Sequence, residues 1–139
     1  MTAAVYPGVY MERRKAILCL CFDSAMLKIR RMLLEHFGYT VLSTSSVEDA
    51  KRLAQNMCPD MLLMDNSYPG VDLQQIASQV KTVCPELITV VLSPFFAVQQ
   101  SSGAIDRFVP KDDGPDALLA QIDELFEEKS NGASDAATM

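Results

Sequence analysis

The chain has 139 residues, of which 49% are apolar, and a formal net charge of −6. This length fits one domain, and no apolar stretch reaches the roughly 18 residues of a membrane span, so we expect a soluble globular protein. The acidic balance argues against a nucleic-acid partner, because binding to phosphates normally starts from a basic surface. Residues 1–10 lack the basic start and long apolar run of a signal peptide, which predicts a cytoplasmic location.

Apolar runs typical of strands alternate with segments of helical periodicity from residue 16 onward. In the first half of the chain, strands are predicted at residues 16–22, 39–43 and 61–65. A helix from Ser24, as its N-cap, to Gly38 separates the first two strands. Its apolar stripe is formed by Met26, Ile29, Leu33 and Phe37. A second helix begins in the capping-box pattern Ser45-Ser46-Val47-Glu48, and Pro59 follows its end.

The second half repeats this alternation. Strands are predicted at residues 87–92 and 107–110, with helices over residues 72–83 and from Gly114-Pro115 through Phe126. Five strands, each followed by a helical segment, predict an α/β fold with a five-stranded parallel sheet and helices on both faces. Residues 1–14 and 129–139 are small, polar or turn-rich, so they are predicted to be flexible arms flanking a domain at residues 15–128.

Asp65 closes the short apolar run 61–64 and is followed directly by the turn-forming residues 66–70. In a parallel sheet, the carboxyl ends of the strands open onto the crevice where ligands usually bind. A carboxylate there is suited to act as a nucleophile, whereas an Asp after a strand can equally be a turn former or a helix cap. Taken alone, the residue leaves both interpretations open.

The four cysteines are Cys19, Cys21, Cys58 and Cys84. They show no Cys-x-x-Cys spacing, and the single histidine, His36, falls in a helical pattern, so no zinc site is expected. Cys19 and Cys21 share one face of a predicted strand, where free cysteines commonly behave as small buried apolar side chains.

The segment PDMLLMDNSYPGVD, at residues 59–72, resembles the acceptor strand and proline loop of the receiver domains of bacterial two-component response regulators. The resemblance covers residues 15–128 and implies a flavodoxin-like three-layer fold. It places the phospho-acceptor at Asp65 and the proline of the following loop at Pro69. Phosphoryl transfer needs such a nucleophile in line with the phosphorus atom.

Three residues further along the chain extend the resemblance. Ser93 falls where receivers carry a hydroxyl that contacts the phosphoryl group, and Lys111 falls on their lysine after the fifth strand. Phe108 falls on their switch aromatic. Each has an ordinary alternative as a surface or strand-end residue, but their order and their positions at strand ends favour a shared phosphoryl site. The resemblance therefore implies catalytic roles for Asp65, Ser93 and Lys111, and switch roles for Ser93 and Phe108.

The metal-binding part of the receiver pattern is altered. Receivers usually end their first strand with two acidic residues that hold Mg²⁺, whereas Cys21 and Phe22 occupy those positions here. Mg²⁺ prefers hard oxygen ligands, and neither a thiol nor a phenyl ring supplies one. The remaining metal ligands implied by the resemblance are Asp65, Asp23 and the backbone carbonyl of Ser67. We expect weak or absent Mg²⁺ binding, and no other cofactor.

The residues after the fourth strand also differ from the receiver pattern. Pro94 stands where a small residue is usual, and Asp112 replaces a proline after the lysine. The stretch from residue 94 to 105 is short for a crossover helix, so the fourth receiver helix is predicted to be short or irregular. Within it, Phe95 and Phe96 are either anchors for a partner or core-filling side chains.

Three functions are compatible with the sequence. The first is a receiver that accepts phosphate on Asp65 from a histidine kinase or phosphotransfer protein and acts on a downstream protein, without being an enzyme itself. The second is a pseudo-receiver that binds its partner without phosphorylation. The third is a flavodoxin-like domain for a small molecule or cofactor, since Asp65-x-Ser67-x-x-Gly70 is similar to the Asp-x-His-x-x-Gly of cobalamin-binding domains. Ser67, however, stands where that motif needs its histidine.

Overall fold

The computed structural model describes residues 14–66, 70–94 and 103–138, with side chains described through residue 130. The strands are β1 (Ala16–Leu20), β2 (Thr40–Thr44), β3 (Met61–Asp65), β4 (Ile88–Ser93) and β5 (Arg107–Pro110). The helices in these ranges are α1 (Ser24–His36), α2 (Val47–Met57), α3 (Leu73–Val83), the 3-10 helix η3 (Lys111–Asp113) and α4 (Gly114–Thr138). The predicted alternation of strands and helices is confirmed, except after β4, where the expected helical segment falls largely outside these ranges.

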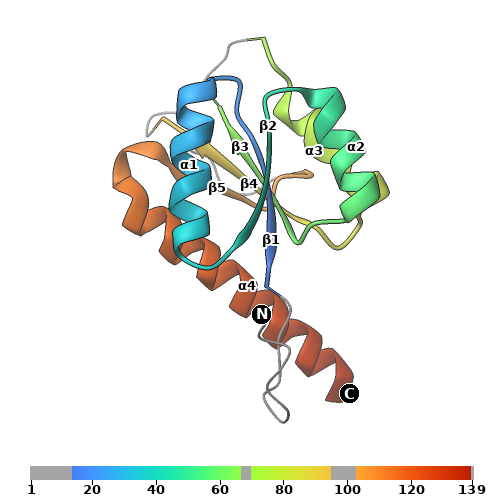
Figure 1. The fold of residues 1–139 in the computed structure, drawn as a ribbon. Helices are drawn as coiled ribbons and strands as arrows, with labels where there is room; N and C mark the ends of the chain where they lie inside the picture. Colours follow the sequence, from blue (N-terminus) through green and yellow to red (C-terminus); the bar gives the residue numbers. More distant parts are fainter. Residues whose placement is uncertain (1–13, 67–69, 95–102, 139) are drawn as a thin grey trace, which may run out of the picture.

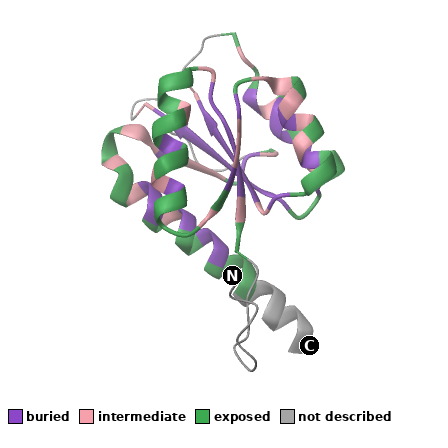
Figure 2. Cartoon of the chain, viewed as in Figure 1, coloured by how far each residue is buried: buried purple, intermediate pink, exposed green. Residues whose placement is uncertain are grey.

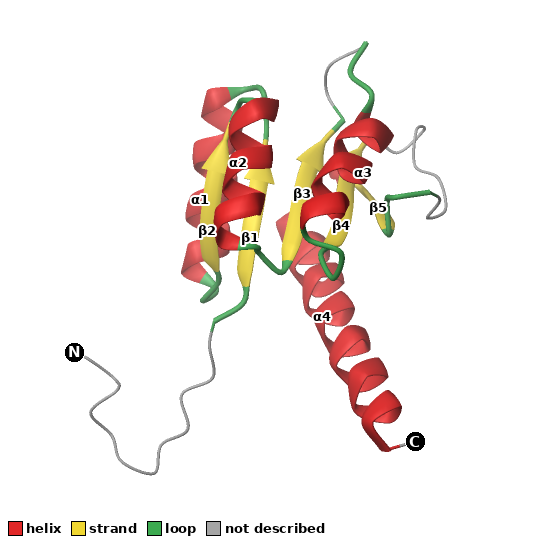
Figure 3. Cartoon of the chain, turned by 90° about the vertical axis from the view of Figure 1, so that its right-hand side faces the viewer, coloured by secondary structure: helices red, strands yellow, loops and turns green. Residues whose placement is uncertain are grey.

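The five strands form one parallel sheet in the order β2-β1-β3-β4-β5. Because all of them run in the same direction, their carboxyl ends meet at one edge (Figure 3). In the register of the sheet, Asp65 pairs with Leu92 of β4, and Ser93 pairs with Pro110 of β5. The sheet therefore brings the last residues of β3, β4 and β5 next to one another.

Helices cover both faces of the sheet, which gives three layers (Figure 1). On one face, α1 and α4 pack against alternate strand residues, including Ile17, Leu63 and Val90. On the other face, α2 and α3 pack against the intervening residues, including Leu18, Leu62 and Val91. The three central strands, β1, β3 and β4, are accordingly buried along most of their length (Figure 2). The predicted parallel, three-layer α/β fold is confirmed.

The apolar stripe of α1, formed by Met26, Ile29, Leu33 and Phe37, is not the face that the helix buries. Three of these are exposed, Met26 by 39%, Ile29 by 59% and Phe37 by 55%. The buried residues of the helix are Arg30 and Leu34. The helix carries two overlapping stripes at helical spacing, and the stripe that faces the sheet contains an arginine.

Helix ends also refine the prediction. Asp23, rather than Ser24, is the N-cap of α1, and its Oδ1 accepts hydrogen bonds from the backbone N–H groups of Ala25 (2.9 Å) and Met26 (3.3 Å). Ser46 caps α2 by accepting a hydrogen bond from the N–H of Asp49 at 3.2 Å. Helix α4 continues to Thr138, so the backbone is helical through most of the segment predicted to be a flexible tail. The domain boundary at residue 128 stays a prediction.

Several residues singled out in the sequence lie outside the described ranges. These are Ser67, Pro69, Phe95 and Phe96. The predicted short or irregular helix between β4 and β5 falls largely on residues 95–102, which also lie outside those ranges. Within the ranges that the structure describes, no helix is long and apolar enough to cross a membrane.

A disulfide that the sequence analysis did not predict joins Cys58 to Cys84, with a Cα–Cα distance of 5.7 Å. Each cysteine is the C-cap of its helix, Cys58 of α2 and Cys84 of α3. Cys58 adopts a left-handed conformation, with φ 43°, which turns the chain out of α2. The bond therefore links the carboxyl-terminal ends of the two helices that cover one face of the sheet.

Candidate functional site

The alternation of side chains along a strand determines which layer each candidate residue faces. Residues 61 and 63 of β3 belong to the core beneath α1 and α4, so Asp65, two residues further, points to the same side. By the same alternation, Cys21 follows Ile17 and Cys19 on that side of β1. The acceptor candidate thus lies between the end of β1 and the inward face of α1.

Asp65 is held by two cations. Its side chain is 3% exposed, and its Oδ2 lies 3.0 Å from Nη1 of Arg30, which is itself 9% exposed. Its Oδ1 forms an ion pair with the Nζ of Lys111 from η3. A buried carboxylate is stable in its ionised form only when paired and hydrogen-bonded. The two cations therefore compensate the burial of Asp65 from opposite sides of the carboxylate.

Arg30 is the functional-site residue that the sequence analysis missed. It lies one turn before the buried Leu34 on α1, so the helix directs it toward the sheet. Its guanidinium group reaches the carboxyl end of β3, 35 residues away in sequence. The sequence does place Arg30 between Leu27 and Leu34 at helical spacing, which suggests an inward-facing arginine. A single arginine in such a stripe does not show which acidic residue it contacts.

The residues at the end of β1 do not form an acidic pair. The Sγ of Cys21 lies 3.9 Å from Oδ2 of Asp65 and 3.5 Å from the backbone oxygen of Asp23. Phe22 packs against the core on the α2 and α3 side. Asp23 is engaged as the cap of α1. Among the residues with described positions, no group of three or more His, Cys, Asp or Glu side chains could hold a metal ion.

Ser93 and Phe108 lie toward the other layer. Ser93 is fully buried, and its Oγ accepts a hydrogen bond from Nδ2 of Asn66 at 3.2 Å. Asn66 follows Asp65 directly, and its backbone N–H donates to the oxygen of Leu92 at 2.7 Å. Phe108 is partly buried against the core beneath α2 and α3. Ser93 is therefore connected to Asp65 through the neighbouring Asn66, whereas Phe108 is placed only in the same layer.

Cys19 lies beneath this site, and the titration of its thiol lowers the stability of the fold at alkaline pH. Burial raises the pKa of its thiol from 9.0 to about 12, and the nearby Asp65 contributes in the same direction, while Arg30 opposes the shift. The unfolded chain loses this proton near pH 9, whereas the folded chain keeps it. The folded state thus binds more protons between these values, so its stability falls as pH rises through that window.

We expect the stability of Cys19→Ala to fall less with rising pH than that of the wild type. Removing the thiol abolishes its contribution, which is at most about 1.4 kcal/mol per pH unit. The free energy of unfolding by urea, measured at several pH values from 8 to 11, will therefore fall less steeply in the variant. An equally steep fall with pH in the two proteins would contradict the raised pKa of Cys19. The comparison uses only the change of stability with pH, because the lost packing also alters the absolute stability.

A hollow of about 260 Å³ opens between α1 and the beginning of α4 and reaches the site. Arg30 and Lys111 line it, together with the apolar side chains of Met26, Ile29, Leu33 and Leu118. The exposed stripe of α1 therefore forms one wall of the approach to the two cations. The exposed apolar residues Met26 and Ile29, which lie outside the core, therefore line this hollow.

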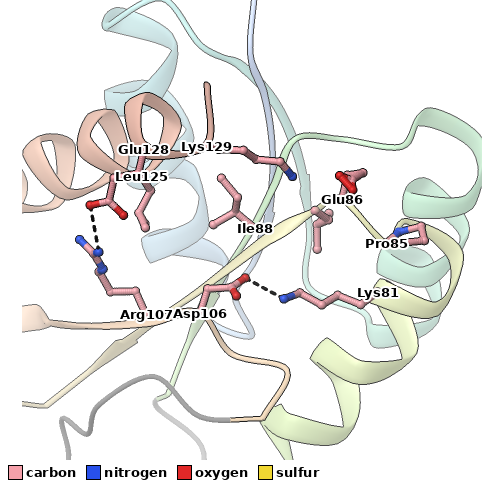
Figure 4. A pocket seen from close by; sticks show the side chains of 10 residues that line it. Lys81, Pro85, Glu86, Ile88, Asp106, Arg107, Leu125, Glu128 and Lys129 are labelled. Carbon is pink, nitrogen blue, oxygen red and sulfur yellow. Dashed lines mark hydrogen bonds and ion pairs between the residues drawn. The ribbon is translucent and has the colours of Figure 1, made fainter. Parts of the chain in front are cut away.

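A second hollow, of about 530 Å³, lies at the opposite edge of the sheet, where β4 and β5 begin (Figure 4). Four of its charged side chains form ion pairs, Lys81 with Asp106 at 2.8 Å and Arg107 with Glu128 at 3.5 Å. It contains neither a cysteine nor a histidine among its lining residues. The hollow at the carboxyl ends of the strands is therefore the stronger candidate site.

Solved structures of receiver domains share this fold. A CheY-like receiver domain from Methanospirillum hungatei matches with a TM-score of 0.73 and 20% identity, over 86% of this chain and 99% of that chain. The response regulator TrrA bound to the histidine kinase ThkA matches with a TM-score of 0.69 and 20% identity, over 80% and 97%. An adenylate cyclase structure from Rhodopirellula baltica reaches 0.76 at 17% identity, over 90% and 96%. The fold is that of the response regulator receiver domains.

One curated relative agrees with this class. The alginate biosynthesis transcriptional regulatory protein AlgB of Pseudomonas aeruginosa is 29% identical over 112 residues. The match covers 77% of this chain and 25% of AlgB, so the chain spans about a quarter of that protein's length. No protein-family model matches the chain.

Proposed function

We propose that the chain is a receiver module of two-component signalling and that Asp65 accepts the phosphoryl group. The observation that carries this proposal is the position of Asp65, buried at the carboxyl end of β3 with Lys111 on one oxygen. An oxygen of Asp65 attacks phosphorus, the bond from phosphorus to the donor atom breaks, and its electron pair leaves with the donor. Lys111 stabilises the charge on the phosphoryl oxygens.

The proposed output passes through the opposite layer. Ser93 turns its hydroxyl from Asn66 to the phosphoryl group, and Phe108, which lies beside the same core, repacks with it. The phosphoryl donor is a histidine kinase or phosphotransfer protein, and a downstream protein reads the change. In this role the protein is a cytoplasmic signalling module and not an enzyme.

A pseudo-receiver is the second candidate. Both oxygens of Asp65 are already paired with cations, and the two usual acidic positions hold Cys21 and Phe22. Such a pairing would also suit an interaction module whose conformation is fixed without phosphate. The two candidates differ in whether Asp65 reacts.

The test is the intact mass after incubation with acetyl phosphate in the presence of Mg²⁺. We expect a phosphoryl-sized increase in the wild type and none in Asp65→Asn. Asp72→Asn is the matched control, because Asp72 is an exposed helix cap, of α3, and Asn is also a good cap. It should react like the wild type. A wild type that gains no mass would reject Asp65 as the acceptor and favour the pseudo-receiver.

A further inference from the structure

Resting on the proposed function of Asp65, we propose that the guanidinium group of Arg30 takes the place of the divalent cation, so that the site accepts a phosphoryl group without Mg²⁺. The fold implies a magnesium site at this edge of the sheet, but the residues present do not fit one. Asp65 is already paired with two cations, Asp23 caps α1, and Cys21 presents a thiol.

The position of Arg30 supports the substitution. Its Nη1 lies 3.0 Å from Oδ2 of Asp65, on the side of the carboxylate that faces the end of β1 and the thiol of Cys21. Lys111 holds the other oxygen, Oδ1. A fixed positive charge thus occupies the space between β1 and β3 where the usual acidic pair would have held a metal. At 9% exposure this charge is largely shielded from solvent, and removing it from Asp65 would leave a buried carboxylate without one of its partners.

The charges of the cluster favour an anion over a cation. One carboxylate and two cations give Asp65, Arg30 and Lys111 together a net positive charge. A divalent cation entering this cluster would be repelled. An aspartyl phosphate carries about two negative charges, which the same two side chains neutralise. The unmodified site is therefore matched to the charge of the product and not to that of a metal.

Arg30 also has the donors that the reaction needs. A guanidinium group has five N–H donors in a fixed planar fork, and its contact with Asp65 uses the Nη1 group. The remaining donors can bind phosphoryl oxygens, since the hollow between α1 and α4 reaches both Arg30 and Lys111. With acetyl phosphate, Asp65 forms the bond to phosphorus and acetate leaves with the electron pair of the broken bond. This transfer requires neither a metal ion nor an oxidant or reductant.

The test measures binding of fluoroberyllate, a mimic of the phosphoryl group, by fluorine NMR. We expect the wild type to bind it equally in EDTA and in millimolar Mg²⁺. Arg30→Gln should weaken binding by about 10- to 100-fold, as expected for loss of a charge-assisted contact. Arg31→Gln is the matched control, because Arg31 is a half-exposed neighbour paired with Glu35, and it should bind like the wild type.

A triple variant, Arg30→Gln with Cys21→Asp and Phe22→Asp, should restore binding in Mg²⁺ but not in EDTA. Wild-type binding that requires Mg²⁺, or that is absent in both conditions, would overturn the role of Arg30, and this comparison needs no variant to fold. Loss of the proposed function has a different signature, namely no mass gain with acetyl phosphate even with Mg²⁺. Labelling of Asp65 that depends on Mg²⁺ would keep the proposed function and reject this inference.

Discussion

Replacing Arg30 with Ala will lower the free energy of unfolding by about 3–5 kcal/mol, the usual cost of removing one partner of a buried ion pair. The variant leaves Oδ2 of Asp65 buried without its guanidinium donor, which lies at 3.0 Å in the native protein. Unfolding by urea at neutral pH measures the loss. Because Lys111 still holds Oδ1, we expect a weakened but folded protein.

Arg31→Ala is the control for this result. Arg31 is adjacent in sequence, and its ion pair with Glu35 joins two side chains that are 53% and 45% exposed. Exposed pairs contribute about 0–1 kcal/mol, so this change should be nearly silent. A double-mutant cycle between Arg30→Ala and Asp65→Ala should give a coupling energy of at least about 1 kcal/mol. Equal effects of Arg30→Ala and Arg31→Ala would show that Arg30 is not buried against Asp65.

Removing the disulfide will lower the free energy of unfolding by about 3 kcal/mol, because the bond closes a loop of intermediate length in the unfolded chain. The two cysteines are 26 residues apart. Cys58→Ser is the suitable variant, since Cys58 is exposed and the change leaves no cavity. The buried Cys84 keeps an acceptor in its reduced form, because its Sγ lies 3.2 Å from the oxygen of Ala54.

Wild-type protein in a thiol reductant provides the matched comparison. It should unfold at the same urea concentration as Cys58→Ser, and the reductant should leave the variant unchanged. Cys19 and Cys21, which are buried and free, do not contribute to this difference. A wild type that is insensitive to reductant, with a variant of equal stability, would contradict the link between α2 and α3.

The sequence was informative where local patterns determine structure. The short apolar runs predicted all five strands, and their alternation with helices predicted a parallel sheet covered on both faces. The order of Asp65, Ser93 and Lys111 at strand ends predicted that they would gather at one edge, and the fold places the three residues there. The strands and the sheet needed only periodicity and the geometry of parallel strands, whereas the resemblance to receiver domains singled out Ser93 and Lys111.

The sequence was less informative where the structure depends on distant contacts. Arg30 is buried because Asp65, on another element, neutralises it, and helical spacing alone favoured the apolar stripe through Ile29. The pairing of Cys58 with Cys84 depends on α2 and α3 ending side by side, which their spacing in the chain does not reveal. Both features required the three-dimensional positions of elements far apart in sequence.

The rate at which wild-type protein gains a phosphoryl group from acetyl phosphate in EDTA, compared with the rate in millimolar Mg²⁺, tests the central claim most directly. The account predicts similar rates in the two conditions, with the added group on Asp65, because Arg30 and Lys111 supply the positive charge. Labelling confined to the Mg²⁺ sample would contradict metal-free transfer, and labelling in neither sample would contradict Asp65 as the acceptor.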